Sequence, residues 1–186
     1  SSSAASDVYK RQAMGTRTRT RPDESGKPGQ ITPQGRSRLE QEVDRLWRES
    51  RAMAEKVAVA AAEGDRSENA EYTYSKMRLG ALHRKLGFLT RRLKVLTVAK
   101  PPPDDGCVHF GCWVEIEDDE GNRSTYRIVG PDEFDLANGH ISSESPVARA
   151  LLGREVGDEV FVKLPRGDLH ATVVAISVEE PANRER

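Results

Sequence analysis

The sequence predicts an α+β protein in which a long helical hairpin precedes a smaller domain of strands and one helix. Apolar residues recur at alternating steps of four and three through residues 39–60 and again through residues 72–96. That period is typical of coiled-coil seams. After Pro101-Pro102-Pro103, which cannot continue a helix, short segments alternate between apolar and polar residues. This second pattern predicts half-buried β-strands.

The domain boundaries follow from these changes of pattern. Residues 1–30 are polar and lack a sustained apolar period, so they are predicted to form a disordered extension. Residues 1–13 are expected to be non-native, with the natural start at Met14, because SSSAASDVYKRQ resembles translated cloning sequence. The other predicted parts are the hairpin at 31–99, a linker at 100–106, the C-terminal domain at 107–180 and a tail at 181–186.

The composition excludes several classes of protein. Charged residues make up 32% of the 186 residues, which indicates long exposed helices rather than one compact globule. The longest apolar run is well short of 18 residues, so no membrane association is expected. Two cysteines are too few for a secreted disulfide scaffold, which predicts a cytoplasmic protein. Cys107 and Cys112 flank His109, but no second ligand pair follows at zinc-site spacing, so both are interpreted as strand residues.

Two helical segments with the same period, joined by a short turn, are predicted to pack as an antiparallel hairpin. The first helix is expected to begin with Thr32 as N-cap and Pro33 at its first position. Each arm of about 30 residues would extend about 45 Å. The expected seam residues are Leu39, Val43, Leu46, Ser50, Met53, Val57 and Ala60, followed by Tyr72, Ser75, Leu79, Leu82, Leu86, Leu89, Leu93 and Leu96.

The turn between the arms, EGDRSENAEYTYSK at 63–76, is rich in carboxylates. Its local chemistry fits helix capping, because Gly64 suits a helix end and Asp65 can cap the next helix with Glu68 at N3. Acidic groups also suit the positive end of a helix dipole. On local pattern alone, capping is the preferred interpretation.

The second arm carries a stripe of positive charge. Residues 76–96 contain no Asp or Glu, whereas the first arm mixes both signs. The basic residues of that stretch are Lys76, Arg78, Arg84, Lys85, Arg91, Arg92 and Lys94. A stripe of one sign along a rod is typical of polyanion binding. The alternative, pairing with acids of the facing helix, accounts for some of these residues.

The basic stripe of the second arm suggests a second interpretation of the acidic turn. Carboxylates repel phosphates unless a divalent cation lies between them, and Mg²⁺ is held by one or two carboxylates together with phosphate oxygens. We therefore expect the hairpin to bring Mg²⁺ to a nucleic acid. Another macromolecule would supply the remaining ligands.

The C-terminal half is predicted to be a docking module with an antiparallel-leaning sheet and one helix packed on a face. It contains no evident pair of catalytic carboxylates, nucleophile with its base, or Gly-rich phosphate loop. The predicted strands are 112–118 and 122–130, joined by a turn at 119–121, and 158–164 and 170–178, with a helix at 145–153 capped by Ser145 and started by Pro146.

Three longer motifs resemble the bacterial transcript-cleavage factors of the GreA/GreB family. They are AAAEGDRSENAEYTYSKMRL, FGCWVEIEDDEGNRSTYRIVGPDEFD and ISSESPVARALLGREVGDEV. The resemblance runs from about residue 31 to residue 179. It is closer to the GreB members, because of GDRSENAEYTY, the strongly basic second helix and RIVGPDEFD.

The resemblance implies an antiparallel coiled coil followed by an FKBP-like domain. Such factors bind RNA polymerase at the rim of its secondary channel and insert the hairpin toward the active site. Asp65 and Glu68 would then help the polymerase's aspartates to hold a shared Mg²⁺, which is not expected to bind tightly to the isolated protein. The factor would stimulate the polymerase's own cleavage of backtracked RNA and would not be an enzyme itself.

The resemblance also assigns binding residues, and the protein is expected to be a monomer. Contacts to the extruded 3′ end of the RNA are expected from Arg78, Arg84, Lys85, Arg91 and Arg92. Docking on the polymerase rim is expected from Glu144, Ser145 and Pro146. Position 144 departs from the family pattern, where Asp is usual, and a longer carboxylate re-aims or weakens that contact.

Two other functions remain open from the sequence. One is a Gre-like regulator that occupies the channel and inhibits polymerase without promoting cleavage; the other is a general RNA-binding or structural coiled-coil protein. Retention of GDxSENAEY favours cleavage over the first, and the second would not need acids at fixed positions. The roles of Glu71 and Tyr72 stay undecided.

Overall fold

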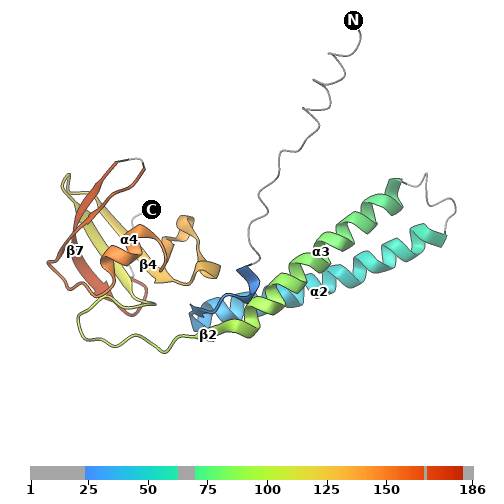
Figure 1. The fold of residues 1–186 in the computed structure, drawn as a ribbon, viewed down its shortest axis with the longest axis horizontal. Helices are drawn as coiled ribbons and strands as arrows, with labels where there is room; N and C mark the ends of the chain where they lie inside the picture. The colour runs from blue at the N-terminus through green and yellow to red at the C-terminus, as the bar shows by residue number, and fades with distance from the viewer. Residues whose placement is uncertain (1–23, 63–69, 166, 182–186) are drawn as a thin grey trace, which may run out of the picture.

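The computed structural model describes residues 24–62, 70–165 and 167–181. Figure 1 shows a helical hairpin, formed by α2 (Pro33–Ala62) and α3 (Ala70–Val95), extending from a sheet domain. The predicted α+β class is confirmed. No helix in the described part of the chain is both long enough and apolar enough to cross a membrane.

The hairpin is held by the predicted seam. Four leucines form its buried cluster, each 8% exposed or less: Leu46, Leu82, Leu86 and Leu89. Every other predicted seam position is buried or half-buried as well. The predicted start of α2 is also confirmed, because the backbone N–H of Gly35 donates to Thr32 Oγ1 at 3.0 Å. A seam this narrow stabilises a rod but leaves most of its surface exposed.

Part of the predicted disordered extension is folded. Short helix η1 (Glu24–Gly26) precedes strand β1 (Gly29–Ile31), which pairs in parallel with β2 (Leu96–Val98) directly after α3. Ser25 is 3% exposed and Ile31 is fully buried. A single apolar residue, Ile31, produces no periodic pattern, so the sequence did not predict that residues 24–31 are folded. Packing against the end of α3 orders this segment.

The C-terminal domain is a mixed sheet of five strands in the order β5-β4-β3-β7-β6. Its strands are β3 (Trp113–Asp118), β4 (Arg123–Val129), β5 (His140–Ser142), β6 (Glu159–Val162) and β7 (Leu169–Ser177). Four strands and the helix α4 (Pro146–Leu151) were predicted, whereas β5 was missed because three residues are too few for an alternating pattern. All neighbours are antiparallel except β4 and β5.

Helix α4 covers the core of this domain. Its Ala148 and Leu151 are fully buried beside sheet residues such as Val114, Ile128 and Val173. Between β4 and β5 the chain forms two short turns of 3₁₀ helix, η2 (Pro131–Glu133) and η3 (Leu136–Asn138). The first of these turns reaches the base of the hairpin.

The hairpin and the sheet domain meet at a polar contact, here called the interdomain joint. Its residues are Lys27, Thr32, Gly35, Arg92, Gly130, Asp132 and Glu133. Residues 99–106, which connect the two parts covalently, contain no helix or strand. The joint therefore restrains the relative orientation of hairpin and sheet domain more than the connecting chain does.

Candidate functional site

The predicted tip acids Asp65 and Glu68 lie outside the described residues. The flanking helices end at Ala62 and begin again at Ala70, and these two helix ends lie at the end of the hairpin farthest from the sheet domain (Figure 1). Just beyond, Glu71 is exposed in the first turn of α3. Tyr72 is half-buried, with Lys76 Nζ 5.7 Å from its ring centroid.

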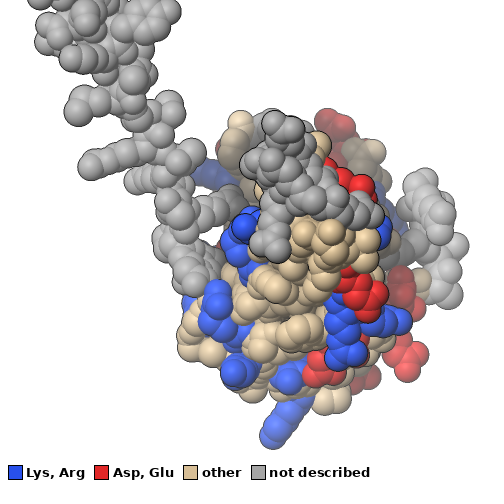
Figure 2. Space-filling view, turned by 90° about the vertical axis from the view of Figure 1, so that its right-hand side faces the viewer, with Lys and Arg blue, Asp and Glu red and all other residues tan. Residues whose placement is uncertain are grey.

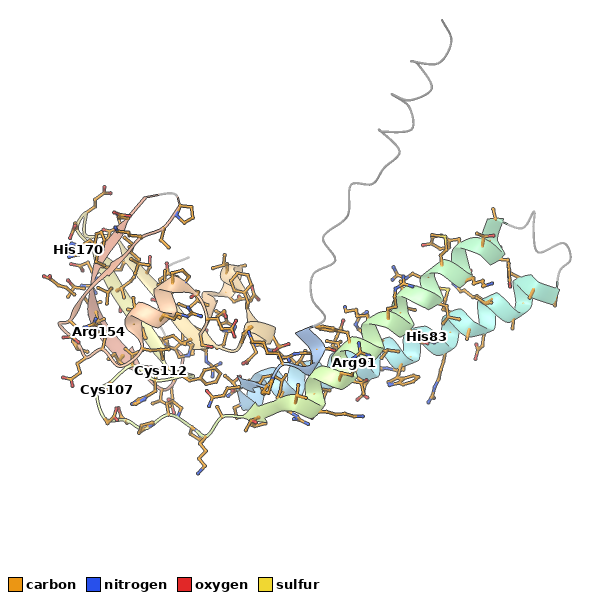
Figure 3. The ribbon with its side chains drawn as sticks, viewed as in Figure 1. His83, Arg91, Cys107, Cys112, Arg154 and His170 are labelled. Carbon is orange, nitrogen blue, oxygen red and sulfur yellow. The ribbon has the colours of Figure 1, made fainter. Side chains whose placement is uncertain are left out.

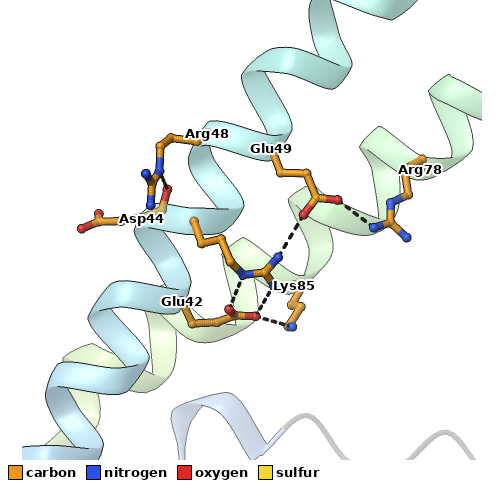
Figure 4. Close-up of polar contacts among 7 residues, drawn as sticks. Glu42, Asp44, Arg48, Glu49, Arg78 and Lys85 are labelled. Atoms are coloured by element: carbon orange, nitrogen blue, oxygen red, sulfur yellow. Dashed lines mark hydrogen bonds and ion pairs between the residues drawn. The ribbon is translucent and has the colours of Figure 1, made fainter.

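Two of the predicted RNA-binding residues pair with the facing helix, as Figure 4 shows. Arg78 Nη2 lies 2.7 Å from Glu49 Oε1, and Lys85 Nζ lies 2.7 Å from Glu42 Oε1. Arg45 links the two acids, with contacts of 2.7 Å to Glu42 and 3.3 Å to Glu49. These five residues form the mid-hairpin cluster.

The cluster keeps the Glu42 carboxylate charged while leaving Arg78 and Lys85 accessible. Hydrogen bonds from Arg45, and then from Lys85, lower the pKa of Glu42 to about 2. The side chains of Arg78 and Lys85 are still 50% and 53% exposed. Both can therefore exchange a carboxylate for a phosphate at little cost, because exposed ion pairs are weak.

The other three predicted RNA-binding residues differ in their exposure and in their partners. Arg84 is exposed and makes no ion pair with any described residue. Arg91, also exposed, donates from Nε to Ser25 Oγ at 2.8 Å near the base of the hairpin (Figure 3). Arg92 differs from both, because its side chain is only 7% exposed and pairs with Asp132 at 2.6 Å.

Arg92 is therefore covered in this conformation, and its contact with RNA stays a prediction. Arg92 follows Arg78 and Lys85 at the same seven-residue spacing, but the sheet domain and the segment around Lys27 cover it. Helical periodicity gives the face on which a residue lies. It does not reveal that a second domain covers one end of that face.

Seen from the far end of the hairpin, Lys and Arg gather on the left and lower parts of the surface (Figure 2). On the right, Asp and Glu lie beside further Lys and Arg side chains (Figure 2). The stripe predicted from α3 includes cations paired with acids of α2, since Arg78 contacts Glu49 and Lys85 contacts Glu42.

The predicted docking segment connects β5 to α4. Ser145 caps α4, since its Oγ accepts from the backbone N–H of Ala148 at 3.2 Å, and Pro146 occupies the first position of the helix. Glu144 is about half exposed and pairs with Lys27 Nζ at 3.0 Å. The segment thus presents Glu144 and Pro146 at the surface on a capped helix start.

Cys107 and Cys112 lie in the loop that leads to β3 (Figure 3). Cys112 is buried directly before that strand, and Cys107 pairs with Glu155 in an isolated β-bridge. Both thiols are free, and burial raises the pKa of Cys112. Across the described ranges, no group of three His, Cys, Asp or Glu side chains is arranged to hold a metal ion.

Sequence reasoning gave no role to Lys27, Asp132 or Glu133. The last two lie in RIVGPDEFD, a motif that carries the family resemblance, but their partners are far away in the sequence. Lys27 lies in the segment that was predicted to be disordered. No local signal in the sequence marks Asp132 as a partner of α3, because 40 residues separate it from Arg92.

Family models match almost the whole described chain. The model for "Transcription elongation factor, N-terminal" matches residues 30–98, and that for "Transcription elongation factor, GreA/GreB, C-term" matches residues 103–178. GreB of Haemophilus influenzae is 51% identical over 143 residues, which are 76% of this chain and 90% of that protein. GreB of Xanthomonas axonopodis is 48% identical over 165 residues, covering 87% and 97%.

Solved structures give a weaker likeness. The GreA/GreB factor of Nitrosomonas europaea is 27% identical with a TM-score of 0.37, covering 54% of this chain and 90% of that one. Gfh1 of Thermus thermophilus is 25% identical with a TM-score of 0.37, covering 79% and 97%. At such TM-scores these structures add nothing to the assignment, which rests on the family models and the relatives. The chain belongs to the GreA/GreB family of transcription elongation factors and is GreB-like.

Proposed function

We propose that this elongation factor binds RNA polymerase and inserts its hairpin into the secondary channel, where it stimulates cleavage of backtracked RNA. The observation that carries the proposal is the position of GDRSENAEY, which occupies the junction of two helices of 30 and 26 residues. A rod of that length reaches about 45 Å from its base. A rod of that length suits a partner with a deep, narrow entrance.

Asp65 and Glu68 are the proposed catalytic and metal-binding residues. Two carboxylates are a poor complete site for Mg²⁺, which takes six oxygen ligands, but they suit a site shared with another protein. In a shared site the ion would supply a lowered pKa for bound water and charge stabilisation of the leaving oxygen. The factor's own contribution is to hold two charged oxygens at the end of a stiff rod.

The basic residues of α3 are proposed to guide the extruded 3′ segment of the RNA. Arg84 is the first choice, because it is exposed and makes no ion pair with any described residue. Arg78 and Lys85 would join it by releasing Glu49 and Glu42. The docking segment, with Glu144, Ser145 and Pro146, is proposed to rest on the rim while the hairpin enters.

The test adds the protein to halted, backtracked elongation complexes and follows shortening of end-labelled RNA. The double variant Asp65→Ala/Glu68→Ala is expected to lower the cleavage rate by on the order of 100-fold or more, because misplacing catalytic groups by about 1 Å already costs that much. Binding to polymerase, measured by fluorescence anisotropy, should change less than about three-fold, about 0.7 kcal/mol.

A matched control removes two carboxylates from the side of the rod instead. Asp44 and Glu55 are exposed on α2 and away from the tip, so Asp44→Ala/Glu55→Ala should leave cleavage close to wild type. Cleavage by the tip variant at the wild-type rate would refute the proposal. Binding by the wild-type protein that slows RNA synthesis without stimulating cleavage would instead favour the channel-binding inhibitor.

A further inference from the structure

The interdomain joint is built around one buried guanidinium. Arg92 Nε and Nη2 contact Asp132 Oδ1 and Oδ2 at 2.9 and 2.6 Å, and Arg92 Nη1 donates to the carbonyl oxygen of Lys27. The two paired side chains are 7% and 13% exposed. A planar guanidinium in such a forked contact fixes direction as well as distance. Arg92 therefore ties three parts together: α3, the segment before β1 and the sheet domain.

A second carboxylate from the sheet domain caps the hairpin. Glu133 accepts from the backbone N–H of Thr32 at 2.8 Å, from the Thr32 hydroxyl and from the backbone N–H of Gly130 at 3.1 Å. Thr32 Oγ1 in turn accepts from Gly35 at the start of α2. A negative group at a helix N-terminus is favourable because of the helix dipole. The start of α2 is thus completed by a residue about 100 positions later.

Two glycines allow this close approach. A Cβ on Gly35 would lie 1.9 Å from Glu133 Oε1, and a Cβ on Gly130 would lie 2.2 Å from the carbonyl oxygen of Gln30. Neither glycine has a positive φ, so close contact alone accounts for the absence of a side chain. By contrast, a Cβ on Gly80, midway along α3, would meet its nearest neighbour at an ordinary 3.5 Å.

The length of the hairpin makes the joint important. With an arm of about 45 Å, a rotation of 5° at the base displaces the far end by about 4 Å. Catalytic groups lose on the order of 100-fold in rate when misplaced by about 1 Å. Residues 99–106 contain no helix or strand that could prevent such a rotation.

We infer that Arg92, Asp132 and Glu133 are positioning residues that fix the direction of the hairpin relative to the docking segment. Lys27 extends the same contact network to that segment through Glu144. The inference rests on the proposed function, because only a tip that acts at a fixed place needs a fixed direction. It assigns a functional role to buried contacts that touch neither RNA nor metal.

The first test measures the joint without any activity. Nitroxide labels at Lys56→Cys and Glu120→Cys, both exposed and on opposite sides of the joint, report the distance between hairpin and sheet domain. The native cysteines are replaced in this background. Wild type should give one narrow distance distribution in the full-length protein. Gly35→Ala should shift or broaden it, because the new methyl group displaces Glu133, whereas Gly80→Ala should leave it unchanged.

The second test measures cleavage with the same variants. Gly35→Ala and Glu133→Ala are expected to lower the maximal cleavage rate at least 10-fold, while the concentration for half-maximal effect changes less than about three-fold. A lower maximal rate at an unchanged half-maximal concentration indicates a misplaced tip, whereas lost docking or lost folding would raise the concentration that is needed. Thr32→Ser, which keeps the hydroxyl, should retain the wild-type rate, whereas Thr32→Val should lose part of it. If Gly35→Ala fails to fold, Asp132→Asn replaces it.

An unchanged distance distribution in both Gly35→Ala and Glu133→Ala would overturn the inference. So would a broadened distribution with an unaltered cleavage rate, since direction would then be irrelevant. If the wild-type protein fails to stimulate cleavage, the proposed function is refuted, and the positioning role is refuted with it. The distance measurement still decides separately whether the joint fixes the hairpin.

Discussion

The middle and the base of the hairpin use the same row of basic residues in different ways. In the middle, Arg78 and Lys85 pair with acids of α2 while their side chains stay half exposed. At the base, the next residue of the row, Arg92, is buried with Asp132 from the sheet domain. One sequence pattern therefore yields exchangeable pairs at one level and a permanent contact at the other.

The difference shows that burial, not charge, decides what each basic residue does. An exposed pair contributes little to stability, so its cation remains available for another anion. A buried pair cannot open without leaving a charge unpaired in a poorly solvated place. The RNA-binding part of the row should accordingly end before Arg92.

The largest effect on stability is expected from breaking the pair at the base. Arg92→Met leaves Asp132 without its partner and should lower the free energy of unfolding by about 3–5 kcal/mol, as loss of one member of a buried pair does. Urea unfolding followed by circular dichroism measures the change. Replacing both residues with apolar ones should recover much of the loss, and a double variant no more stable than Arg92→Met would contradict this account of the pair.

The next largest effect concerns the middle, where packing should matter more than ion pairs. Leu86 is 3% exposed in the seam, so Leu86→Ala should lower the free energy of unfolding by about 2–4 kcal/mol. The same urea experiment applies. Val59 is 59% exposed on α2, and Val59→Ala serves as a control that should behave like wild type.

A smaller effect should depend on pH. The folded-state pKa of Glu42, about 2, lies below its unfolded value of about 4.3, so its stabilising contribution is present above the unfolded pKa and is lost as pH falls toward 2. Because the pairs are partly exposed, the loss should be about 0.5–1 kcal/mol. Comparing wild type with Glu42→Gln at pH 6 and pH 3 measures it; equal pH dependence of the two proteins argues against the assignment.

The smallest effect is expected for Arg78. Its pair with Glu49 is half exposed, so Arg78→Ala should shift the urea midpoint by less than the experimental error. If Arg78→Ala lowered the free energy of unfolding as much as Arg92→Met does, the ion pairs in the middle and at the base of the hairpin would contribute equally to stability, contrary to this account. The two variants are best measured side by side.

Periodicity predicted the seam well because each seam residue is defined by its neighbours on the same helix. Leu46 of α2 and Leu82 of α3 belong to one buried cluster, as their spacing predicts. The strands on either side of the turn at 119–121 were predicted equally well, because alternation of apolar and polar residues and turn residues are both local signals. Capping of α2 by Thr32 was predicted for the same reason.

Contacts between segments that lie far apart in the sequence could not be predicted. The cap of α2 is completed by Glu133, and Arg92 finds its partner 40 residues later, so no local pattern contains either contact. Strand β1 and helix η1 become ordered only against the end of α3. At the docking segment, the capping role of Ser145 was predicted, but the pair between Glu144 and Lys27 was not.

The central claim, that α3 divides into an RNA-guiding middle and a fixed base, is tested by cleavage of shallowly and deeply backtracked complexes. We predict that Arg84→Ala/Lys85→Ala slows cleavage of deeply backtracked complexes far more than of shallow ones, because only a long extruded 3′ segment reaches the middle. Arg92→Met should slow both to the same degree. Equal slowing by the double variant, or selective slowing by Arg92→Met, would contradict the division.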